Sequence, residues 1–353
     1  MSVLKKLEKA FIVNFEITNQ CNLDCMFCSA QLSRYARKDL PTSKVLSIID
    51  KIAQQDIYSI FLTGGEPLLR NDLPQIIERC MNHEMNVMLS TNGIMESEEV
   101  ADRIASTGLE EIQVSIHAPN EINDRLVQAD GALEQSLQGL RNLVNAGLKV
   151  TVASVATRKN INLLPKLAKQ VAEMGAKYFR VLRLIPHSDK MLKFLVPYEE
   201  MRKTVDEFGL LDDNLSDFTI SIHASPGFVD EKFSDPDEYS IVHPLCHTCT
   251  AGKTSFGILP NGDCVPCLEL KDPEFICGNI LDKTIDKIWD SQPMATIRSA
   301  TPDRYKGECA DCNKKWLCYS ARCVAHNLEG DILGDDVSCY LLRGEDRKPN
   351  LGR

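Results

Sequence analysis

Short apolar segments alternate with amphipathic helical patterns from residue 11 to about residue 184. The apolar segments have the length of strands, and two of the helical patterns end at a glycine, as helices often do. Strand ends recur about every 25–35 residues, which is the spacing of βα units. We therefore predict an α/β fold with a parallel, partly closed barrel, whose working edge is the carboxyl end of the strands. The six predicted strands are residues 11–18, 57–63, 86–91, 111–116, 149–155 and 178–184.

The regular alternation ends near residue 225, and residues 240 to 345 are rich in Cys, Gly, Pro and Asp. Only one clear helical pattern remains there, at residues 284–299. This segment has little apolar mass for a core of its own, so we expect metal–thiolate bonds to hold it together. We predict a barrel domain over residues 1–230, a small cysteine-rich domain over residues 240–345 and a mobile tail over residues 346–353.

The composition of the chain argues against several classes of function. A net charge of −10 over 353 residues provides no basic face, which argues against a nucleic-acid partner. No apolar run is long enough to span a membrane, and the first apolar stretch is broken by Asn14 and Glu16, unlike a signal peptide. We therefore predict a cytoplasmic protein without a membrane partner. In that reducing compartment, 14 cysteines indicate soft metals or iron–sulfur clusters rather than disulfides.

The first cysteine group lies in "EITNQCNLDCMFCSAQ", directly after the first predicted strand. Cys21, Cys25 and Cys28 stand within eight residues. Three thiolates can ligate three irons of a [4Fe–4S] cluster and leave the fourth iron open. A structural zinc site would need four closed ligands, and no fourth is nearby. The spacing therefore favours iron–sulfur over zinc.

The stretch "CNLDCMFC" resembles the CxxxCxΦC signature of radical S-adenosylmethionine enzymes, with Phe27 as the aromatic residue. These enzymes carry it after the first strand of a partial (β/α)6 barrel. The resemblance implies that S-adenosylmethionine chelates the open iron. An electron, delivered by a donor such as flavodoxin or ferredoxin, would then release a 5′-deoxyadenosyl radical that abstracts hydrogen from the substrate.

The stretch "GGEP" after the second predicted strand resembles the family's glycine-rich strand end, whose backbone binds the methionine ammonium group. Two glycines also let a backbone approach a ligand closely. By the same resemblance the backbone of one aromatic residue meets the adenine, and two polar residues at strand ends lie near the sulfonium, ribose or carboxylate. The implied cofactor-binding residues are Phe27, Gly64, Gly65, Glu66, Pro67, Asn92 and Ser115.

The cysteine-rich segment resembles a SPASM domain, an extension that carries two auxiliary [4Fe–4S] clusters. Seven cysteines match its pattern in order, although four residues separate Cys318 from Cys323 where the pattern has three. The hairpin-like "ILPNGDCVPC" belongs to the same resemblance, and Asn-Gly favours a hairpin turn on physical grounds. The implied ligands are Cys249, Cys267 and Cys323 for the first auxiliary cluster, and Cys309, Cys312, Cys318 and Cys339 for the second.

The first auxiliary cluster is thus one ligand short. Cys246 and Cys264 are the candidates to close it, Cys277 is a third, and otherwise an open iron would face substrate. A zinc reading stays open, because Cys246, Cys249, Cys264 and Cys267 form CxxC…CxxC, which is typical of a zinc ribbon. Cys80 lies on an apolar helical face and is expected to be a core thiol.

We expect three [4Fe–4S] clusters and a net two-electron oxidation, by dehydrogenation or cross-linking, of a ribosomally made peptide. The alternative is a small-molecule dehydrogenase or epimerase acting on an aminosugar, another natural product or a cofactor precursor. In an epimerase, Cys264 or Cys277 would return hydrogen to the substrate. Only ten residues precede the first strand, which favours a small molecule, a separate leader-peptide-binding protein or recognition by the barrel itself. A non-catalytic iron–sulfur or zinc module is the more distant alternative.

Overall fold

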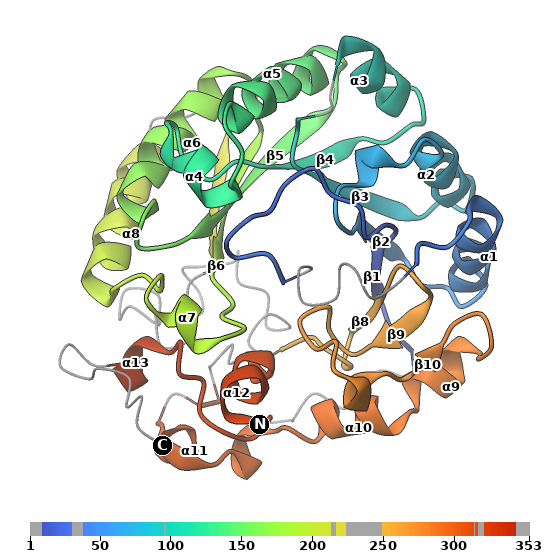
Figure 1. The fold of residues 1–353 in the computed structure, drawn as a ribbon, viewed down its shortest axis with the longest axis vertical. Coiled ribbons are helices and arrows are strands. Elements are labelled where there is room, and N and C mark those ends of the chain that lie inside the picture. The colour runs from blue at the N-terminus through green and yellow to red at the C-terminus, as the bar shows by residue number, and fades with distance from the viewer. Residues whose placement is uncertain are drawn as a thin grey trace.

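The computed structural model describes residues 9–29, 38–94, 97–212, 217–223, 249–313, 315–316 and 321–343. Parallel strands form a curved sheet that closes partway round a barrel (Figure 1). All six predicted strands are confirmed, and a further parallel strand, β7, follows them in the sheet. The strands are β1 (Ile12–Glu16), β2 (Ser59–Thr63), β3 (Asn86–Thr91), β4 (Glu111–Ser115), β5 (Lys149–Ala156), β6 (Tyr178–Arg183) and β7 (Thr219–His223).

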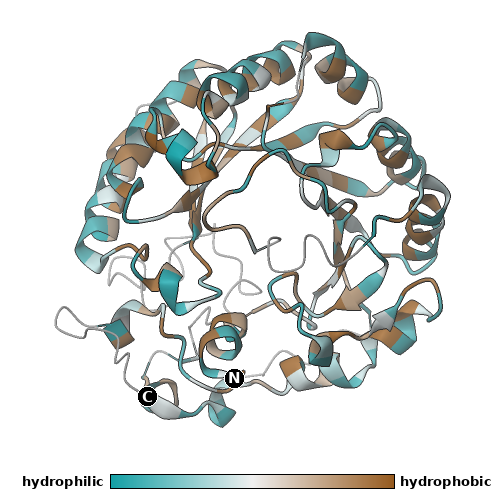
Figure 2. Cartoon of the chain, viewed as in Figure 1, coloured by the Kyte–Doolittle hydropathy of each residue, from teal (hydrophilic) through white to brown (hydrophobic). Residues whose placement is uncertain are grey.

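Helices connect successive strands and lie on the outside of the barrel (Figure 1). Their apolar residues gather on the side that meets the sheet, whereas polar residues face outward (Figure 2). In α1, for example, Val45, Ile48, Ile49 and Ile52 are buried, which is the spacing of one helical face. The connecting helices are α1 (Thr42–Ala53), α2 (Leu73–Asn82), α3 (Glu98–Ala105), α4 (Ile122–Val127), α5 (Ala132–Asn145), α6 (Leu164–Glu173), α7 (Asp189–Leu192) and α8 (Tyr198–Asp212).

The cysteine-rich segment continues the same sheet. Strand β8 (Ser255–Ile258) pairs in parallel with β1, and β9 (Asp263–Val265) and β10 (Gly278–Asn279) add antiparallel pairs beyond it. The predicted hairpin between β8 and β9 is confirmed, and Gly262 in its turn has a φ of +88°, a backbone conformation that glycine adopts readily. The two domains therefore share one ten-stranded sheet.

This sharing corrects the expectation that metal–thiolate bonds alone hold the segment. Phe256, Ile258, Trp289 and Met294 are buried in the same apolar core as the barrel. A smaller second core forms around Leu270, Phe275, Ile297 and Val324. Apolar contacts with the barrel supply the core that the segment does not build on its own.

The single helix predicted over residues 284–299 was wrong in extent, because two helices occupy it. Helix α9 (Ile285–Trp289) ends before Asp290, and α10 (Gln292–Arg298) begins with Pro293 in its first turn, where a proline costs no hydrogen bond. Three further helices follow, α11 (Gly307–Asp311), α12 (Arg322–Glu329) and α13 (Tyr340–Arg343).

The predicted domain boundary at residues 230–240 and the tail at 346–353 lie outside the described residues. Across the part of the chain that is described, none of the helices combines the length and the apolar character that crossing a bilayer requires.

Candidate functional site at the mouth of the barrel

The "GGEP" strand end lies directly against the segment that leads into the first cysteine loop. Gly65 N–H donates to the Thr18 carbonyl at 2.8 Å, and Glu66 N–H donates to the Gln20 carbonyl at 2.7 Å. A Cβ at Gly65 would stand 2.0 Å from the Gln20 oxygen, and Gly64 has a φ of +149°. The glycines thus permit a close approach between two strand ends of the protein itself.

The carboxylate of Glu66 is turned into the protein. It accepts hydrogen bonds from Thr91 Oγ1 at 2.8 Å and from the backbone N–H groups of Asn92 at 2.7 Å and Leu68 at 3.1 Å. Complete burial raises the pKa of Glu66 to about 7, although the three hydrogen bonds act in the opposite direction. Glu66 therefore joins the ends of β2 and β3, directly before Pro67 begins a short 3-10 turn.

Asn92 fastens the cysteine loop from the end of β3. Its Nδ2 donates to Asn22 Oδ1 at 2.7 Å, and its Oδ1 accepts from the Ile94 N–H at 3.0 Å. Ser115 is the last residue of β4 and is partly exposed. The side chain of Asn92 thus acts on the loop that carries the thiols.

The cysteine loop is held on the end of α4. The Met26 N–H donates to the Leu126 carbonyl at 2.9 Å, and the Asp24 N–H donates to the Val127 carbonyl at 3.3 Å. Cys21 and Cys25 pack against a small apolar cluster formed by Leu23, Val127 and Ala132. Cys21, Cys25 and Cys28 all remain partly exposed.

Apolar and aromatic side chains pack beside Cys28, the third cysteine of the loop. The rings of Phe27 and His117 meet edge to face with centroids 4.7 Å apart, and Phe27 packs against a buried cluster of Leu184, Met191 and Leu195. His117 Nδ1 accepts the Val155 N–H at 3.2 Å, and burial lowers the pKa of His117 to about 4. The ring is therefore neutral and carries its proton on Nε2.

These groups fit an iron–sulfur cluster with S-adenosylmethionine. Three thiols on one loop are reachable from outside, and none of the cysteines in the described ranges forms a disulfide. Within those ranges, no hydrogen bond reaches the carbonyl oxygens of Gly64 and Gly65, which leaves two acceptors for an ammonium group. The side chains packed around Phe27 offer an apolar surface of the kind that an adenine ring requires.

Cys249, Cys267 and Cys323 meet at the junction of the two domains. The side chains of Cys323 and Cys267 are hydrogen bonded, and this contact together with burial raises the pKa of Cys323. Burial and the nearby Cys267 raise the pKa of Cys249. Cys323 is buried, whereas Cys249 and Cys267 are partly exposed. Neighbouring thiols that repel one another when ionised favour the binding of a metal cation, because a metal removes their protons outright.

Cys264 and Cys277 lie elsewhere. They neighbour each other across β9 and β10, with the Cys277 N–H donating to the Cys264 carbonyl at 2.8 Å, and both belong to the main apolar core. Cys264 is 0% and Cys277 2% exposed. The structure does not bring them together with the three thiols above. Cys80 is buried in the same core, where burial raises its pKa to about 12, as expected of a core thiol.

The remaining described cysteines lie around α11 and the segment before α13. The Cys309 N–H donates to Asp335 Oδ1 at 2.8 Å, and the Cys339 N–H donates to the Asp336 carbonyl at 2.8 Å. Adjacent aspartates thus tie Cys309 and Cys339 to one segment, and Cys312 follows the last turn of α11. Cys246 and Cys318 lie outside the described residues.

Within the described ranges, no three His, Cys, Asp or Glu side chains are close enough to share one metal ion. A cluster spreads its thiolates over several irons, so its ligands stand further apart than those of one ion. The zinc reading also needs Cys264 beside Cys249 and Cys267, whereas Cys264 faces the apolar core.

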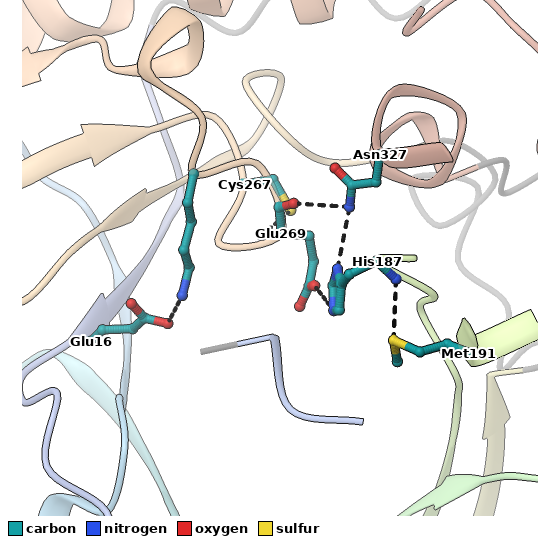
Figure 3. A network of polar contacts seen from close by, with 7 residues as sticks. Glu16, His187, Met191, Cys267, Glu269 and Asn327 are labelled. Carbon is teal, nitrogen blue, oxygen red and sulfur yellow. Dashed lines mark hydrogen bonds and ion pairs between the residues drawn. The ribbon is translucent and has the colours of Figure 1, made fainter. Parts of the chain in front are cut away.

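A polar network lies beside Cys267 (Figure 3). Asn327 Nδ2 donates to His187 Nδ1 at 3.2 Å, and His187 Nε2 faces Glu269 Oε2 at 3.2 Å. The carboxylate of Glu269 also accepts from the Ser29 hydroxyl, and the Glu269 N–H donates to Cys267 Sγ at 3.5 Å. Glu269 therefore lies beside residues next to both Cys28 and Cys267.

This network was missed from the sequence. Its members come from the loop after β6, the loop after β9 and helix α12, so no local spacing relates them. A buried ion pair nearby, between Lys271 Nζ and Glu16 Oε1 at 2.7 Å, joins residues 255 positions apart. The signal that the sequence did offer was Glu16 itself, the charged residue of β1.

Comparisons with known proteins agree with this geometry. Residues 15–171 match the family model of the radical SAM superfamily, and residues 249–313 match SPASM, an iron–sulfur cluster-binding domain. The chain is 27% identical to the mycofactocin maturase MftC of Mycolicibacterium smegmatis over 344 residues, covering 94% of this chain and 83% of MftC. It is 25% identical to the AdoMet-dependent heme synthase of Nitratidesulfovibrio vulgaris, covering 93% and 91% of the two chains.

Among solved structures, SuiB of Streptococcus suis superposes with a TM-score of 0.76 at 17% identity, covering 95% of this chain and 78% of SuiB. SuiB bound to its precursor peptide SuiA superposes with a TM-score of 0.70 at 18% identity, over 90% of this chain and 72% of SuiB. At these identities the likeness concerns the fold.

Proposed function

This chain belongs to the radical S-adenosylmethionine superfamily and carries a SPASM domain, and on that premise we propose that it oxidatively modifies a ribosomally made peptide. When bound, the cofactors supply reductive cleavage of S-adenosylmethionine and a carbon radical that removes a substrate hydrogen atom. The observation that supports the proposal is the position of Glu269, whose N–H donates to Cys267 Sγ at 3.5 Å and whose carboxylate lies beside Ser29 of the first cysteine loop. This neighbourhood supports a substrate that lies between the first cysteine loop and Cys267.

The residues of the chain then have separate tasks. The three thiols of the first loop hold one cluster, the carbonyls of Gly64 and Gly65 receive the methionine ammonium group, and Phe27 borders the adenine. Asn92 and Glu66 act indirectly. Asn92 holds the cysteine loop, and Glu66 holds the end of β2 against the end of β3. Ser115 is partly exposed at the same edge of the sheet and is assigned to the ribose or carboxylate.

We assign two auxiliary clusters to the cysteine-rich domain, and three clusters in all. Cys249, Cys267 and Cys323 hold the first, with Cys246 as the fourth ligand, since Cys264 and Cys277 lie in the apolar core. The same burial argues against these two thiols as hydrogen donors and favours oxidation over epimerisation. The second cluster takes Cys309, Cys312, Cys318 and Cys339.

The peptide substrate rests on two likenesses, to a maturase in sequence and to SuiB, solved with its precursor peptide, in fold. A separate leader-peptide-binding protein and a flavodoxin or ferredoxin donor complete the proposal. The domains are taken as residues 1–230 and 240–345, with residues 346–353 as a tail. A cytoplasmic location suits the 14 cysteines, which need reducing conditions.

A porphyrin substrate is the second candidate. The heme synthase relative matches 93% of this chain and 91% of its own length, so no large part of either chain is unmatched. Peptide and porphyrin substrates would both have to enter the space between the two cysteine groups.

The test is iron and sulfide content after anaerobic reconstitution, followed by 5′-deoxyadenosine formation with dithionite. We expect about twelve irons in the wild type and about eight in the variant with Cys21, Cys25 and Cys28 replaced by alanine. That variant should form no 5′-deoxyadenosine. The Cys80→Ala variant is the matched control and should keep both values, because Cys80 is a core thiol. A triple variant that still forms 5′-deoxyadenosine contradicts the proposal, as does a wild type that forms none.

A further inference from the structure

Polar side chains occupy part of the barrel interior, where a packed barrel would be apolar. Phe179 and Val181 of β6 are 0% exposed and belong to the core under the helices, and Phe179 lies against Phe208 of α8. Alternation along the strand therefore turns Arg180 to the inside. Branched apolar residues normally fill a barrel interior. Here the inward positions of neighbouring strands include Ser90, Gln113, Ser115 and Arg180.

Arg180 lies level with the cofactor end of the barrel. The strand register pairs Ser115 with Ala153 and Ala153 with Arg180, so Arg180 stands two strands from the end of β4, on the order of 10 Å. The small side chain of Ala153 lets Arg180 pass over β5 to Gln113. The guanidinium is thus directed into the space below the proposed S-adenosylmethionine site.

Within the described ranges, Arg180 has no carboxylate partner. Its one hydrogen bond is a long one, from Nη1 to Gln113 Oε1 at 3.4 Å, and its Nε is buried without an acceptor. Glu111 attracts it only at longer range, and burial lowers its pKa. By contrast Arg183, on the same strand, has Asp336 Oδ2 at 3.7 Å. A partly buried guanidinium with no carboxylate in contact and one buried N–H without an acceptor is costly, so its retention calls for a reason.

We propose that Arg180 binds a carboxylate of the substrate inside the barrel. Guanidinium and carboxylate match as two parallel hydrogen bonds, one of which would use the Nε that now has no acceptor. Gln113 holds the far side of the guanidinium, and Gln113 is itself fixed by its bond to Ser90 Oγ at 3.2 Å. This inference rests on the proposed function and narrows its substrate to a molecule that carries a carboxylate near the reacting carbon.

The test measures binding of 3-phenylpropionate and of the neutral 3-phenylpropionamide to the reconstituted holoenzyme by calorimetry. We expect the wild type to bind the acid about tenfold or more tightly than the amide, as a charge-assisted pair should. Arg180→Gln should abolish this preference, and Arg180→Lys should keep part of it, because an ammonium group lacks the planar fork. The control Arg141→Gln, on the exposed side of α5, should behave as wild type. Equal binding of acid and amide by the wild type overturns the inference, and so does a preference that survives Arg180→Gln.

Two further measurements test whether Arg180 instead binds the cofactor or only stabilises the fold. The affinity for S-adenosylmethionine should be unchanged in Arg180→Gln, and a parallel loss would mean that Arg180 holds the cofactor's own carboxylate, which overturns the substrate assignment. The melting temperature of Arg180→Gln should equal or exceed that of the wild type, because a partly buried charge with no carboxylate in contact is removed. A clear fall in melting temperature would make Arg180 a structural residue instead.

The proposed function can fail independently. If the wild type prefers the acid but forms no 5′-deoxyadenosine, the enzymatic proposal is contradicted and the carboxylate site is supported. If the wild type forms 5′-deoxyadenosine but binds acid and amide equally, the enzymatic proposal is supported and the carboxylate site is contradicted.

Discussion

At the scale of single residues, burial decides the charge of the polar groups around the cysteine loop. Burial raises the pKa of Glu66 to about 7 and lowers the pKa of His117 to about 4. In both cases burial favours the neutral form over the charged form, because the protein interior solvates a charge poorly. The sequence could place both residues at strand ends, but neither shift could be predicted from it, since both depend on neighbours from other strands.

His117 should make the stability of the protein depend on pH. Its folded pKa of about 4 lies below the ordinary value of 6.5, so between these values the unfolded chain binds a proton that the folded protein does not. Its contribution is therefore complete above pH 6.5 and falls by about 3 kcal/mol as the pH drops to 4. Denaturant titrations from pH 4 to 8 measure this loss.

The variant His117→Asn is the matched comparison, because its amide oxygen can still accept the Val155 N–H. It should show a flatter profile than the wild type below pH 6.5. An identical slope in both proteins would rule out His117 as the source.

At the scale of elements, the structure shows why the end of β2 needs glycine. The end of β2 lies on the segment after β1 through two backbone hydrogen bonds, at a separation that leaves no room for a Cβ at Gly65. The sequence showed the glycines but not which backbone they approach. The helix over residues 284–299 failed for a local reason, because Pro293 begins a helix more easily than it continues one.

Gly65→Ala should disrupt the site more than an ordinary glycine substitution. The new Cβ would overlap the Gln20 carbonyl, which is backbone and cannot rotate away, so we expect a loss of about 3 kcal/mol or more in the free energy of unfolding. Iron content should fall with it, because the cysteine loop would shift. The control is Gly209→Ala in α8, where nothing lies within 4 Å of the new Cβ. It should be neutral or stabilise the protein by up to about 1 kcal/mol. Equal effects from the two substitutions would refute the packing argument.

At the scale of the whole molecule, three kinds of contact join the cysteine-rich domain to the barrel: strand pairing, a common apolar core and an ion pair. Strand β8 pairs with β1, Trp289 lies in the common core, and Lys271 pairs with Glu16. The side chains of this ion pair are 7% and 8% exposed. Removing one partner would take the nearest counter-ion from a buried charge.

Lys271→Met should therefore cost about 3–5 kcal/mol in the free energy of unfolding, measured by denaturant titration. The double variant Glu16→Gln with Lys271→Met should recover much of that loss, because both charges of the pair are then removed together. The exposed pair of Lys149 and Glu110 is the control, and Lys149→Met should cost less than about 1 kcal/mol. A double variant as unstable as the single one would show that the pair's charges do not couple.

The sequence by itself determined the elements, the barrel and the loop of three thiols, because strand and helix periodicity and short cysteine spacings are local properties. Which distant cysteines meet was implied only by the family resemblance, which left the fourth thiol of the first auxiliary cluster open. Cys264 and Cys267 are three residues apart, and only the pairing of β9 with β8 and β10 turned Cys264 into the apolar core and left Cys267 beside Cys323. The tertiary structure likewise decided that Arg180 faces Gln113 inside the barrel and that Ser29 meets Glu269. Such contacts join segments far apart in the chain, and their geometry follows from how the sheet curves and the domains pack, which no local pattern encodes.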